Sequence, residues 1–215
     1  MDTLAAAWQW IVANRSDFDK ALAIHVEYSL VSLAIGVAIC VPLGILVARS
    51  RLVSLIAINL FSTVRVIPSV AILFLAVPIL GFTFRSTLVA LTVLACPPIL
   101  VNTAAGFASI DAAVVESARG VGMSEWQVLR RVETPLATPI VLAGIRIAAL
   151  EVVASATLAT FIGGGGLGDI ITQGLSNQQF EVILAGAIPV ALLALSAEVL
   201  FSGLQRVLTP AGVAG

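Results

Sequence analysis

One polar stretch of this chain carries the residue types that can do chemistry. It runs from Glu116 to Pro135 and reads ESARGVGMSEWQVLRRVETP. Its three arginines and three glutamates stand in a chain of which only 11% of the residues are charged. Guanidinium groups pair with carboxylates in a fixed two-pronged geometry, and an aromatic residue such as Trp126 is a frequent interface anchor. The chemistry indicated is recognition: the arginines could meet acids on a partner protein, or they could face anionic lipid headgroups.

Signals for helix ends predict that this segment is ordered. Asp111 can cap a helix that begins at Ala112, because its carboxylate accepts a backbone N–H that lacks a helical partner. Either Gly120 or Gly122 can end that helix, since glycine adopts the left-handed conformation at little cost. The pattern indicates a helix followed by a tight turn.

A second helix is expected directly after the turn. Ser124 precedes Gln127 by three residues, which is the spacing of a capping box. Trp126 and Leu129 follow at helical spacing. Pro135 has no backbone N–H, and we expect it to stop this helix before the next apolar run. The segment is thus predicted to be an ordered helix pair.

Three further charges fall inside apolar runs, where ionisable groups often mark function. Arg146 either extends to the membrane surface from the end of its run or has a role at depth. Glu151 could pair with Arg65 as a structural bridge, or it could face a transport path and meet a cationic substrate. The residues alone leave these alternatives open.

No combination of side chains typical of catalysis stands out. The one histidine, His25, is expected at a membrane interface, and there is neither a G-x-S-x-G motif nor a His/Cys cluster. Cys40 and Cys96 lie inside apolar runs, which is typical of buried thiols. A membrane-embedded enzyme such as an intramembrane protease is therefore disfavoured, and no catalytic residue, metal or cofactor is predicted.

The composition sets the environment of these residues. Of the 215 residues, 60% are hydrophobic, and the mean hydropathy is +1.11. A soluble domain carries about 25% charged residues, so this chain is predicted to be an integral membrane protein. The net charge of −1 gives no sign of a nucleic-acid partner.

Five segments contain the roughly 20 apolar residues that cross a bilayer. Arg65, Pro68 and Pro78 interrupt the second, and small residues spaced by four, such as Cys40 and Gly44, form stripes that let helices pack closely. The predicted fold class is all-α, a polytopic membrane helix bundle of about five transmembrane helices that lines a cavity. The segments are approximately 24–48, 52–80, 86–107, 139–162 and 181–204.

Basic residues between the segments indicate an orientation by the positive-inside rule. Six of them fall on one side, whereas Arg15, Lys20 and Arg85 fall on the other. This bias predicts that residues 111–135 are cytoplasmic and that residues 1–20 form an extracytoplasmic N-terminal segment, without the basic start of a cleaved signal peptide. It also puts GGGGLGD, residues 163–169, on the outer side.

The polar segment resembles the EAA motif of binding-protein-dependent ABC importer permeases. That motif reads E-A-A, three residues, G, nine residues, I, one residue, L-P. Glu116, Ala118, Gly122 and Pro135 match it with the same spacing over twenty residues. The departures, all small or neutral replacements, are Ser117, Val132 and Thr134.

Other stretches, over about residues 27–208, resemble the glycine betaine/choline/carnitine class of these permeases. They read RVIPSVAILFLAVPILG, VNTAAGFASIDAAVVESARGVGM and AGIRIAALEVVASATLATFIGGGGLGDIITQGL. The resemblance implies a MetI-like ABC permease fold in a single transmembrane permease domain, residues 1–215, as a multi-pass protein of a bacterial plasma membrane, the cell inner membrane. Methionine-type permeases share the Gly-Gly-Leu-Gly-Asp element and stay an alternative.

The resemblance also implies a mechanism. In this family the motif forms coupling helices that enter a groove on a cytoplasmic ABC ATPase subunit, so residues 111–135 would be a cytoplasmic coupling loop. ATP hydrolysis would belong to that separate chain, and this chain would be a non-catalytic permease subunit. The residues expected to couple it to the ATPase are Glu116, Ser117, Ala118, Gly122, Ser124, Trp126, Arg130, Arg131 and Pro135.

The further partners implied are a second permease chain, identical or paralogous, an extracytoplasmic substrate-binding protein and the lipid bilayer. The implied cargo is a quaternary-ammonium osmoprotectant such as glycine betaine, choline or carnitine. The alternatives are amino-acid transport, of methionine or another small polar solute, and a non-transport membrane scaffold protein.

Overall fold

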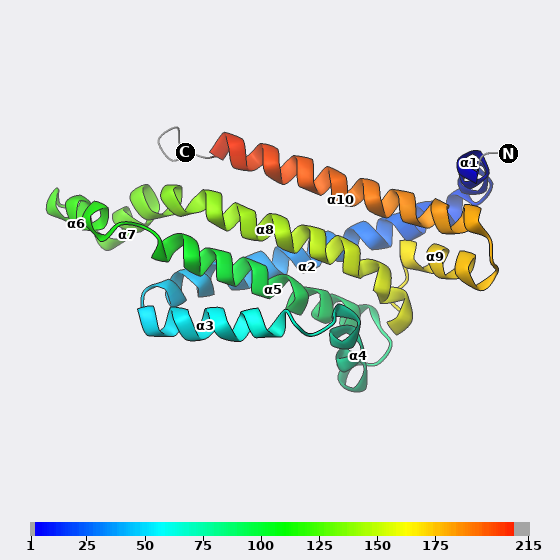
Figure 1. Ribbon diagram of the computed structural model, residues 1–215, viewed down its shortest axis with the longest axis horizontal. Helices are drawn as coiled ribbons and strands as arrows, with labels where there is room; N and C mark the ends of the chain where they lie inside the picture. The colour runs from blue at the N-terminus through cyan, green and yellow to red at the C-terminus, as the bar shows by residue number, and fades with distance from the viewer. Residues whose placement is uncertain (1–2, 209–215) are drawn as a thin grey trace. The chain divides into compact units, whose positions relative to one another are not determined.

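The computed structural model describes residues 3–208, and every regular element among them is helical (Figure 1). Element η1 is π-helical and η2 is 3₁₀-helical. In chain order the elements are α1 (Thr3–Ala13), α2 (Arg15–Ala48), α3 (Arg51–Val64), α4 (Ser69–Leu80), α5 (Phe84–Ala108), α6 (Ala112–Gly120), α7 (Glu125–Val128), η1 (Leu129–Glu133), α8 (Thr134–Ala156), η2 (Thr157–Ile162), α9 (Leu167–Ser176) and α10 (Phe180–Leu208).

Four stretches of helix are long and apolar enough to cross a membrane. The pair α3 and α4 passes the same test when taken together across the break between them. Counted as one broken span, this pair brings the total among residues 3–208 to five, which confirms the predicted all-α membrane bundle. The four continuous stretches are Arg15–Ala48, Phe84–Ala108, Glu125–Ile162 and Phe180–Leu208.

The break between α3 and α4 lies where polar and proline residues interrupt the second apolar segment. Arg65 forms the C-cap of α3, and Pro68 forms the N-cap of α4 with a ψ angle of 135°. Proline disfavours the helical conformation of the residue before it, so a helix usually ends there. Pro78 lies inside α4, so of the two prolines it is Pro68 that marks the break.

Packing divides the chain into two units. The first contains residues 3–35, 67–95 and 149–197. The second contains residues 36–66, 96–148 and 198–208. The long helices α2, α5, α8 and α10 contribute residues to both units.

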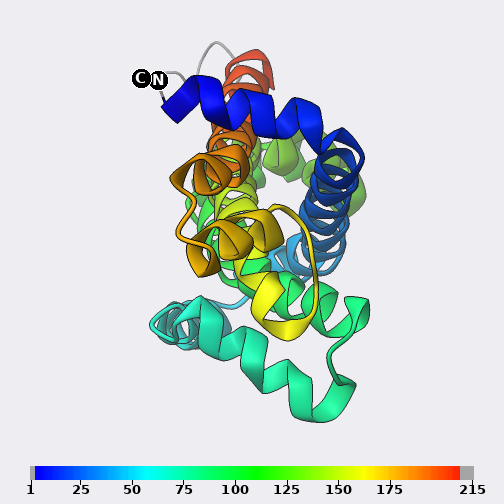
Figure 2. The same cartoon turned by 90° about the vertical axis from the view of Figure 1, so that its right-hand side faces the viewer.

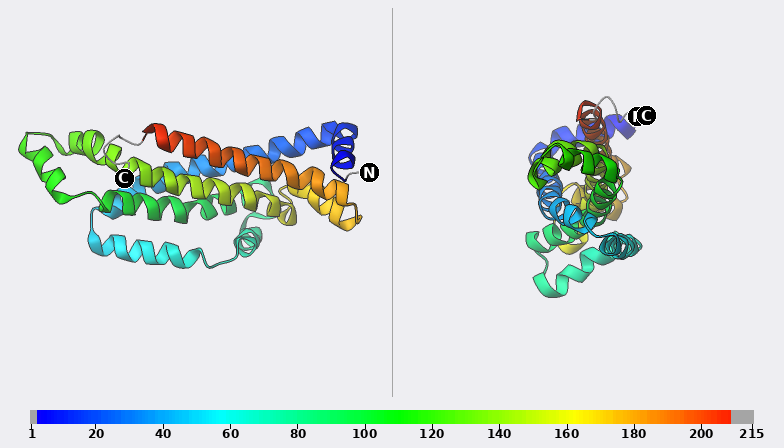
Figure 3. Two further views of the ribbon diagram at one scale, coloured as in Figure 1. Left: turned by 45° about the horizontal axis from the view of Figure 1, so that its top comes forward. Right: turned by 90° about the vertical axis from the view of Figure 1, so that its left-hand side faces the viewer.

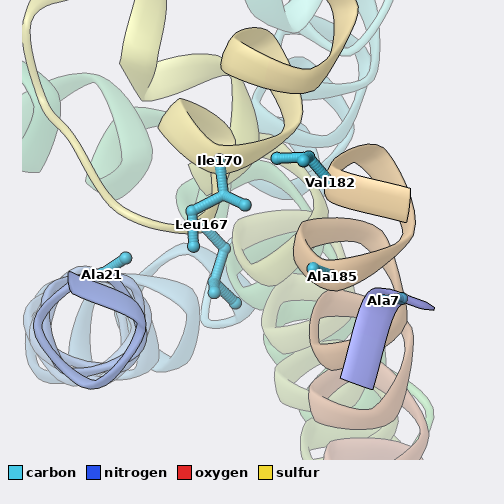
Figure 4. Packing of buried hydrophobic residues seen from close by; sticks show 6 residues of the cluster. All are labelled: Ala7, Ala21, Leu167, Ile170, Val182 and Ala185. Carbon is cyan, nitrogen blue, oxygen red and sulfur yellow. The ribbon is translucent and has the colours of Figure 1, made fainter. Parts of the chain in front are cut away.

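The first unit has a core of small and branched side chains drawn from α1, α2, α9 and α10 (Figure 4). Helix α1 contributes Ala7 to this core, while its neighbour Trp8 is exposed. In Figure 2 this helix, coloured dark blue, leads into α2. The buried members of the core are Ala7, Ala21, Leu167, Ile170, Val182 and Ala185.

The glycine run between η2 and α9 is a packed turn of defined shape. Three of its glycines have positive φ angles, a conformation that residues with a Cβ rarely adopt. Close behind them, a Cβ on Gly168 would lie 2.1 Å from the carbonyl oxygen of Thr157. The backbone of α9 therefore touches the backbone of η2. The positive φ angles belong to Gly163, Gly165 and Gly166.

His25 lies in the core of the first unit, which corrects the expectation of an interfacial position. Its side chain is fully buried, and Nε2 lies 3.1 Å from the carbonyl oxygen of Val153. The glycine turn closes over the ring, with the position of a Cβ on Gly166 only 3.6 Å from Nδ1. A backbone carbonyl takes the place of water at Nε2, whereas Nδ1 is buried without a hydrogen-bond partner among the described residues.

In the second unit, small residues let helices approach closely. A Cβ on Gly44 of α2 would lie 2.6 Å from the Cβ of Thr103 of α5. A Cβ on Gly144 of α8 would lie 2.7 Å from the carbonyl oxygen of Pro98 of α5. The stripes of small residues in the sequence therefore mark helix contacts, as membrane packing favours.

Replacing Gly168 by alanine should destabilise the protein by about 1–3 kcal/mol, because the added methyl group collides with backbone that cannot move alone. Gly203→Ala is the matched control, since its added methyl group meets nothing within 4 Å. It should leave stability unchanged or raise it by about 0.5–1 kcal/mol, as alanine favours helix. Thermal unfolding of the purified variants in detergent measures both, and equal midpoints would contradict this account of the turn.

Candidate functional site

The polar segment begins with the capped helix that the sequence predicts. Asp111 is the N-cap of α6, and its Oδ1 accepts a hydrogen bond from the N–H of Ala113 at 2.9 Å. Within α6, Ala118 is buried, whereas Glu116 and Ser117 are exposed. Ser117 donates from its hydroxyl to the carbonyl oxygen of Ala113 at 2.7 Å, so the serine at this position of the motif is hydrogen-bonded within α6.

The turn after α6 is a Schellman motif built on Gly122. This glycine has a φ of +87°, and its N–H donates to the carbonyl oxygen of Arg119 at 2.9 Å. The N–H of Met123 reaches back to the carbonyl oxygen of Ala118 at 3.2 Å. These two bonds satisfy carbonyls that the helix end leaves free. Of the two glycines that could end α6, Gly122 takes the left-handed position.

The second helix starts with the predicted capping box. The N–H of Gln127 donates to Oγ of Ser124 at 3.4 Å, and Oε1 of Gln127 accepts from the N–H of Ser124 at 2.9 Å. Each residue thus satisfies a free backbone group of the other. The turn and both neighbouring helix ends are therefore fixed by hydrogen bonds within the segment.

An ion pair also crosses the turn. The guanidinium of Arg119 donates to both carboxylate oxygens of Glu125, at 2.8 and 2.9 Å. These hydrogen bonds, and then the charge of the carboxylate, raise the pKa of Arg119. An exposed pair adds little stability alone, but its two-pronged geometry restrains the angle between α6 and α7. The sequence did not predict this pair. Arg119 and Glu125 are six residues apart, and only the tight turn between them brings their side chains together.

Pro135 does not stop the second helix, contrary to the expectation from the sequence. Helix α7 continues through the π-helical turn η1 into α8, which begins at Thr134. The N–H of Thr134 bonds to the carbonyl oxygen of Leu129, five residues back. Pro135, which has no N–H to offer, occupies the first turn of α8, where proline is tolerated.

Several side chains of the segment are exposed. Trp126 is 66% exposed, and Arg130 and Arg131 are also exposed. Val128, on the same short helix, is buried. Helices α6 and α7 face the viewer in the right-hand view of Figure 3. A large exposed aromatic with two nearby cations on a rigid support is suited to binding a protein.

A polar pocket of about 280 Å³ lies beside α6. Its lining includes Glu116 and Arg119 of the segment and a second ion pair, between Arg49 and Glu133. Glu133 is buried, and its two oxygens accept from the guanidinium of Arg49 at 2.8 and 2.7 Å. Sequence reasoning missed this pair because its members are 84 residues apart.

The three charged residues within the apolar runs differ in their contacts and exposure. Nη1 of Arg146 lies 3.3 Å from a carboxylate oxygen of Glu198 and donates to Ser202 at 2.9 Å. The side chain therefore joins α8 to α10, and its extension to the membrane surface stays a prediction. Arg65 is exposed at the end of α3. Glu151 is half-buried in α8 and belongs to the other unit, and a pair between these two stays a prediction.

Within residues 3–208, no group of three or more His, Cys, Asp or Glu side chains is placed to hold a metal ion. The titratable groups of the polar segment are joined in pairs or exposed to solvent. What this geometry shows is an ordered polar loop whose tryptophan and several of whose charged side chains are exposed. Bundle and loop together define a multi-pass membrane protein with one ordered polar loop.

Comparison with known proteins assigns the family. Residues 40–211 match the family described as "Binding-protein-dependent transport system inner membrane component", and the chain belongs to this family. It is a multi-pass inner-membrane permease subunit. The matched residues include the polar segment and most of the helices, which confirms the resemblance to ABC importer permeases.

Curated relatives are similar along most of their length. The carnitine transport permease protein OpuCB of Listeria monocytogenes is 42% identical over 189 residues, which cover 88% of this chain and 87% of the relative. The glycine betaine/carnitine/choline transport system permease protein OpuCB of Bacillus subtilis is 40% identical, with 89% and 88% covered. The choline transport system permease protein OpuBB of the same bacterium is 40% identical, with 88% and 87% covered.

Solved structures share the fold. An inward-facing structure of the MetNI methionine ABC transporter superposes with a TM-score of 0.77 at 22% identity, covering 91% of this chain and 98% of that one. The crystal structure of an amino acid ABC transporter with histidines gives a TM-score of 0.68 at 18% identity, with 93% and 95% covered. The MetI-like fold implied by the sequence is thereby confirmed.

Gly122→Ala should loosen the segment, because alanine at a positive φ costs about 1 kcal/mol. Gly120→Ala is a matched control: neither added methyl group meets an atom within 4 Å, and only Gly122 has a positive φ. Hydrogen exchange of the amides of residues 121–128 should rise in the first variant and stay at the wild-type rate in the second. Equal exchange in both would show that the left-handed turn is not what orders the segment.

Proposed function

We propose that the chain is the permease subunit of an ATP-driven importer of quaternary-ammonium osmoprotectants, with glycine betaine, carnitine and choline as substrates. The observation that carries the proposal is the 40–42% identity, over most of both chains, to permeases named for these compounds. The solved methionine transporter, at 22% identity, supports the fold and not the cargo. The capped polar segment supplies the mechanical part that such an importer needs.

In this proposal residues 111–135 are the cytoplasmic coupling loop, and an ABC ATPase subunit grips it. The basic residues of the loop favour the cytoplasmic side, which leaves the N-terminal segment extracytoplasmic. Trp126 would be the anchor in the ATPase groove, with Arg130 and Arg131 meeting carboxylates around it. Glu116, Ala118 and Gly122 set the shape of the turn, and Ser117, Ser124 and Pro135 complete its frame.

Rigidity is what makes the loop useful. Closure of the ATPase dimer can shift the bundle between two states only if the contacts differ between those states. A loop fixed by two N-caps, a Schellman turn and an ion pair moves as one body. A loop without these bonds would absorb the displacement and leave the transmembrane helices where they were.

Two permease chains, identical or paralogous, would enclose the substrate path in this assembly. A separate extracytoplasmic binding protein would capture the substrate and determine most of the specificity. This chain carries three tryptophans and a single tyrosine, few aromatic residues for a cage that holds a trimethylammonium group by cation–π attraction. A low-affinity conduit fits that composition.

Trp126→Ala should weaken capture of the ATPase subunit by about 2 kcal/mol or more, the usual size of a central aromatic anchor. Trp8→Ala is the matched control, because both side chains are 66% exposed and only Trp126 belongs to the loop. Co-purification and titration of the detergent-purified partners measure the effect. Unchanged ATPase affinity in Trp126→Ala would remove the loop from the interface.

The cargo is tested by uptake. The chain is reconstituted in proteoliposomes with its cognate ATPase and binding protein, and ATP-dependent uptake of labelled glycine betaine is measured. Excess unlabelled carnitine or choline should suppress the signal, because these compounds share the trimethylammonium group, while excess methionine should not. Uptake of methionine in place of all three compounds would overturn the proposed substrate class.

A further inference from the structure

We propose that Arg49 and Glu133 are positioning residues that fasten the C-terminal end of α2 to the coupling loop, so that movement of the loop is passed to α2. The inference rests on the proposed function, since it concerns how ATPase-driven motion reaches the membrane helices. It deepens that function by naming where the displacement enters the bundle.

Arg49 and Glu133 form a bidentate ion pair. Nη1 and Nη2 of Arg49 each donate to a separate oxygen of Glu133, at 2.8 and 2.7 Å. Two parallel hydrogen bonds fix the relative orientation of their carriers as well as the distance between them. Lysine could not reproduce this, because its ammonium group lacks the planar fork.

Burial makes Glu133 depend on its partner Arg49. The Glu133 side chain is only 7% exposed, and that of Arg49 is 46% exposed. A buried carboxylate without its partner is strongly disfavoured, whereas replacing both partners by neutral side chains can leave stability unchanged. The pair is therefore a means of fixing one arrangement of two segments, more than a source of stability.

Glu133 is connected to the docking face without a break. Helix α7, which carries Trp126, continues directly into η1, and Glu133 is the last residue of η1. Arg49 directly follows α2. A force on Trp126 therefore reaches Glu133 through continuous helical backbone and reaches α2 through the two hydrogen bonds.

The other side-chain hydrogen bonds and the ion pair described for the loop join residues of the loop to one another. The Arg119–Glu125 pair, the Asp111 cap and the capping box all join residues within 111–133. They make the loop one body but attach it to nothing else. The pair with Arg49 reaches out of the loop, and it lines the same pocket as Glu116 and Arg119 of α6, so α6 lies beside this attachment.

The test uses the complete importer in proteoliposomes and counts glycine betaine imported per ATP hydrolysed. The double variant Arg49→Met/Glu133→Gln leaves no unpaired buried charge, so it should assemble with the ATPase and hydrolyse ATP. Its import per ATP should fall about tenfold, the size of a typical coupling between sites. The charge exchange Arg49→Glu/Glu133→Arg should recover import relative to either single reversal.

Arg51→Gln is the control, because this arginine lies two residues beyond Arg49 and is exposed; its import per ATP should equal that of wild type. Wild-type import per ATP in Arg49→Met/Glu133→Gln would overturn the inference alone. Absence of ATP-driven import in the wild-type complex would instead refute the proposed function, and with it the inference.

Discussion

Inside a lipid bilayer a backbone N–H or carbonyl has no water to bond with, so each must find a partner in the protein. Helices meet this requirement through most of residues 3–208, and irregular backbone is confined to short stretches that carry their own bonds. In the glycine turn after η2, for example, the N–H of Gly164 donates to the carbonyl oxygen of Ala159 at 2.8 Å. Backbone that is hydrogen-bonded in this way bends little within a helix or turn. A conformational change would therefore displace whole helices together with the turns that join them.

The polar segment follows the same rule although it is rich in charge. Its helix ends are satisfied by Asp111, by Ser124 and by the Gly122 turn, and the π-helical turn carries hydrogen bonding past Pro135. Those bonds explain how a proline can stand in a continuous helix that runs from α7 through α8. Through the same bonds, the proposed docking site at α7 is continuous with a transmembrane helix.

The sequence predicted features that depend on a few neighbouring residues. Helix caps, the Gly122 turn, the break at Pro68 and the number of spans all follow from local patterns, and the structure contains them, although the first span begins earlier than predicted, at Arg15, and the fourth at Glu125. It did not predict the partners of Glu133 and Arg146, because those contacts join helices far apart in the chain. Pro135 was misjudged for a related reason: the local rule for proline assumes α-helical bonding, and η1 is bonded differently.

The six charges of the segment then divide by role. Arg119 and Glu125 hold the turn, and Glu133 is turned into the protein toward Arg49. The remaining three, at positions 116, 130 and 131, are exposed. This division separates the paired side chains, which shape the loop and attach it to α2, from Arg130 and Arg131, which would meet the proposed partner. Because different side chains serve the two roles, substitutions at Arg130 and Arg131 would change the affinity for a partner and leave the Arg49–Glu133 pair intact.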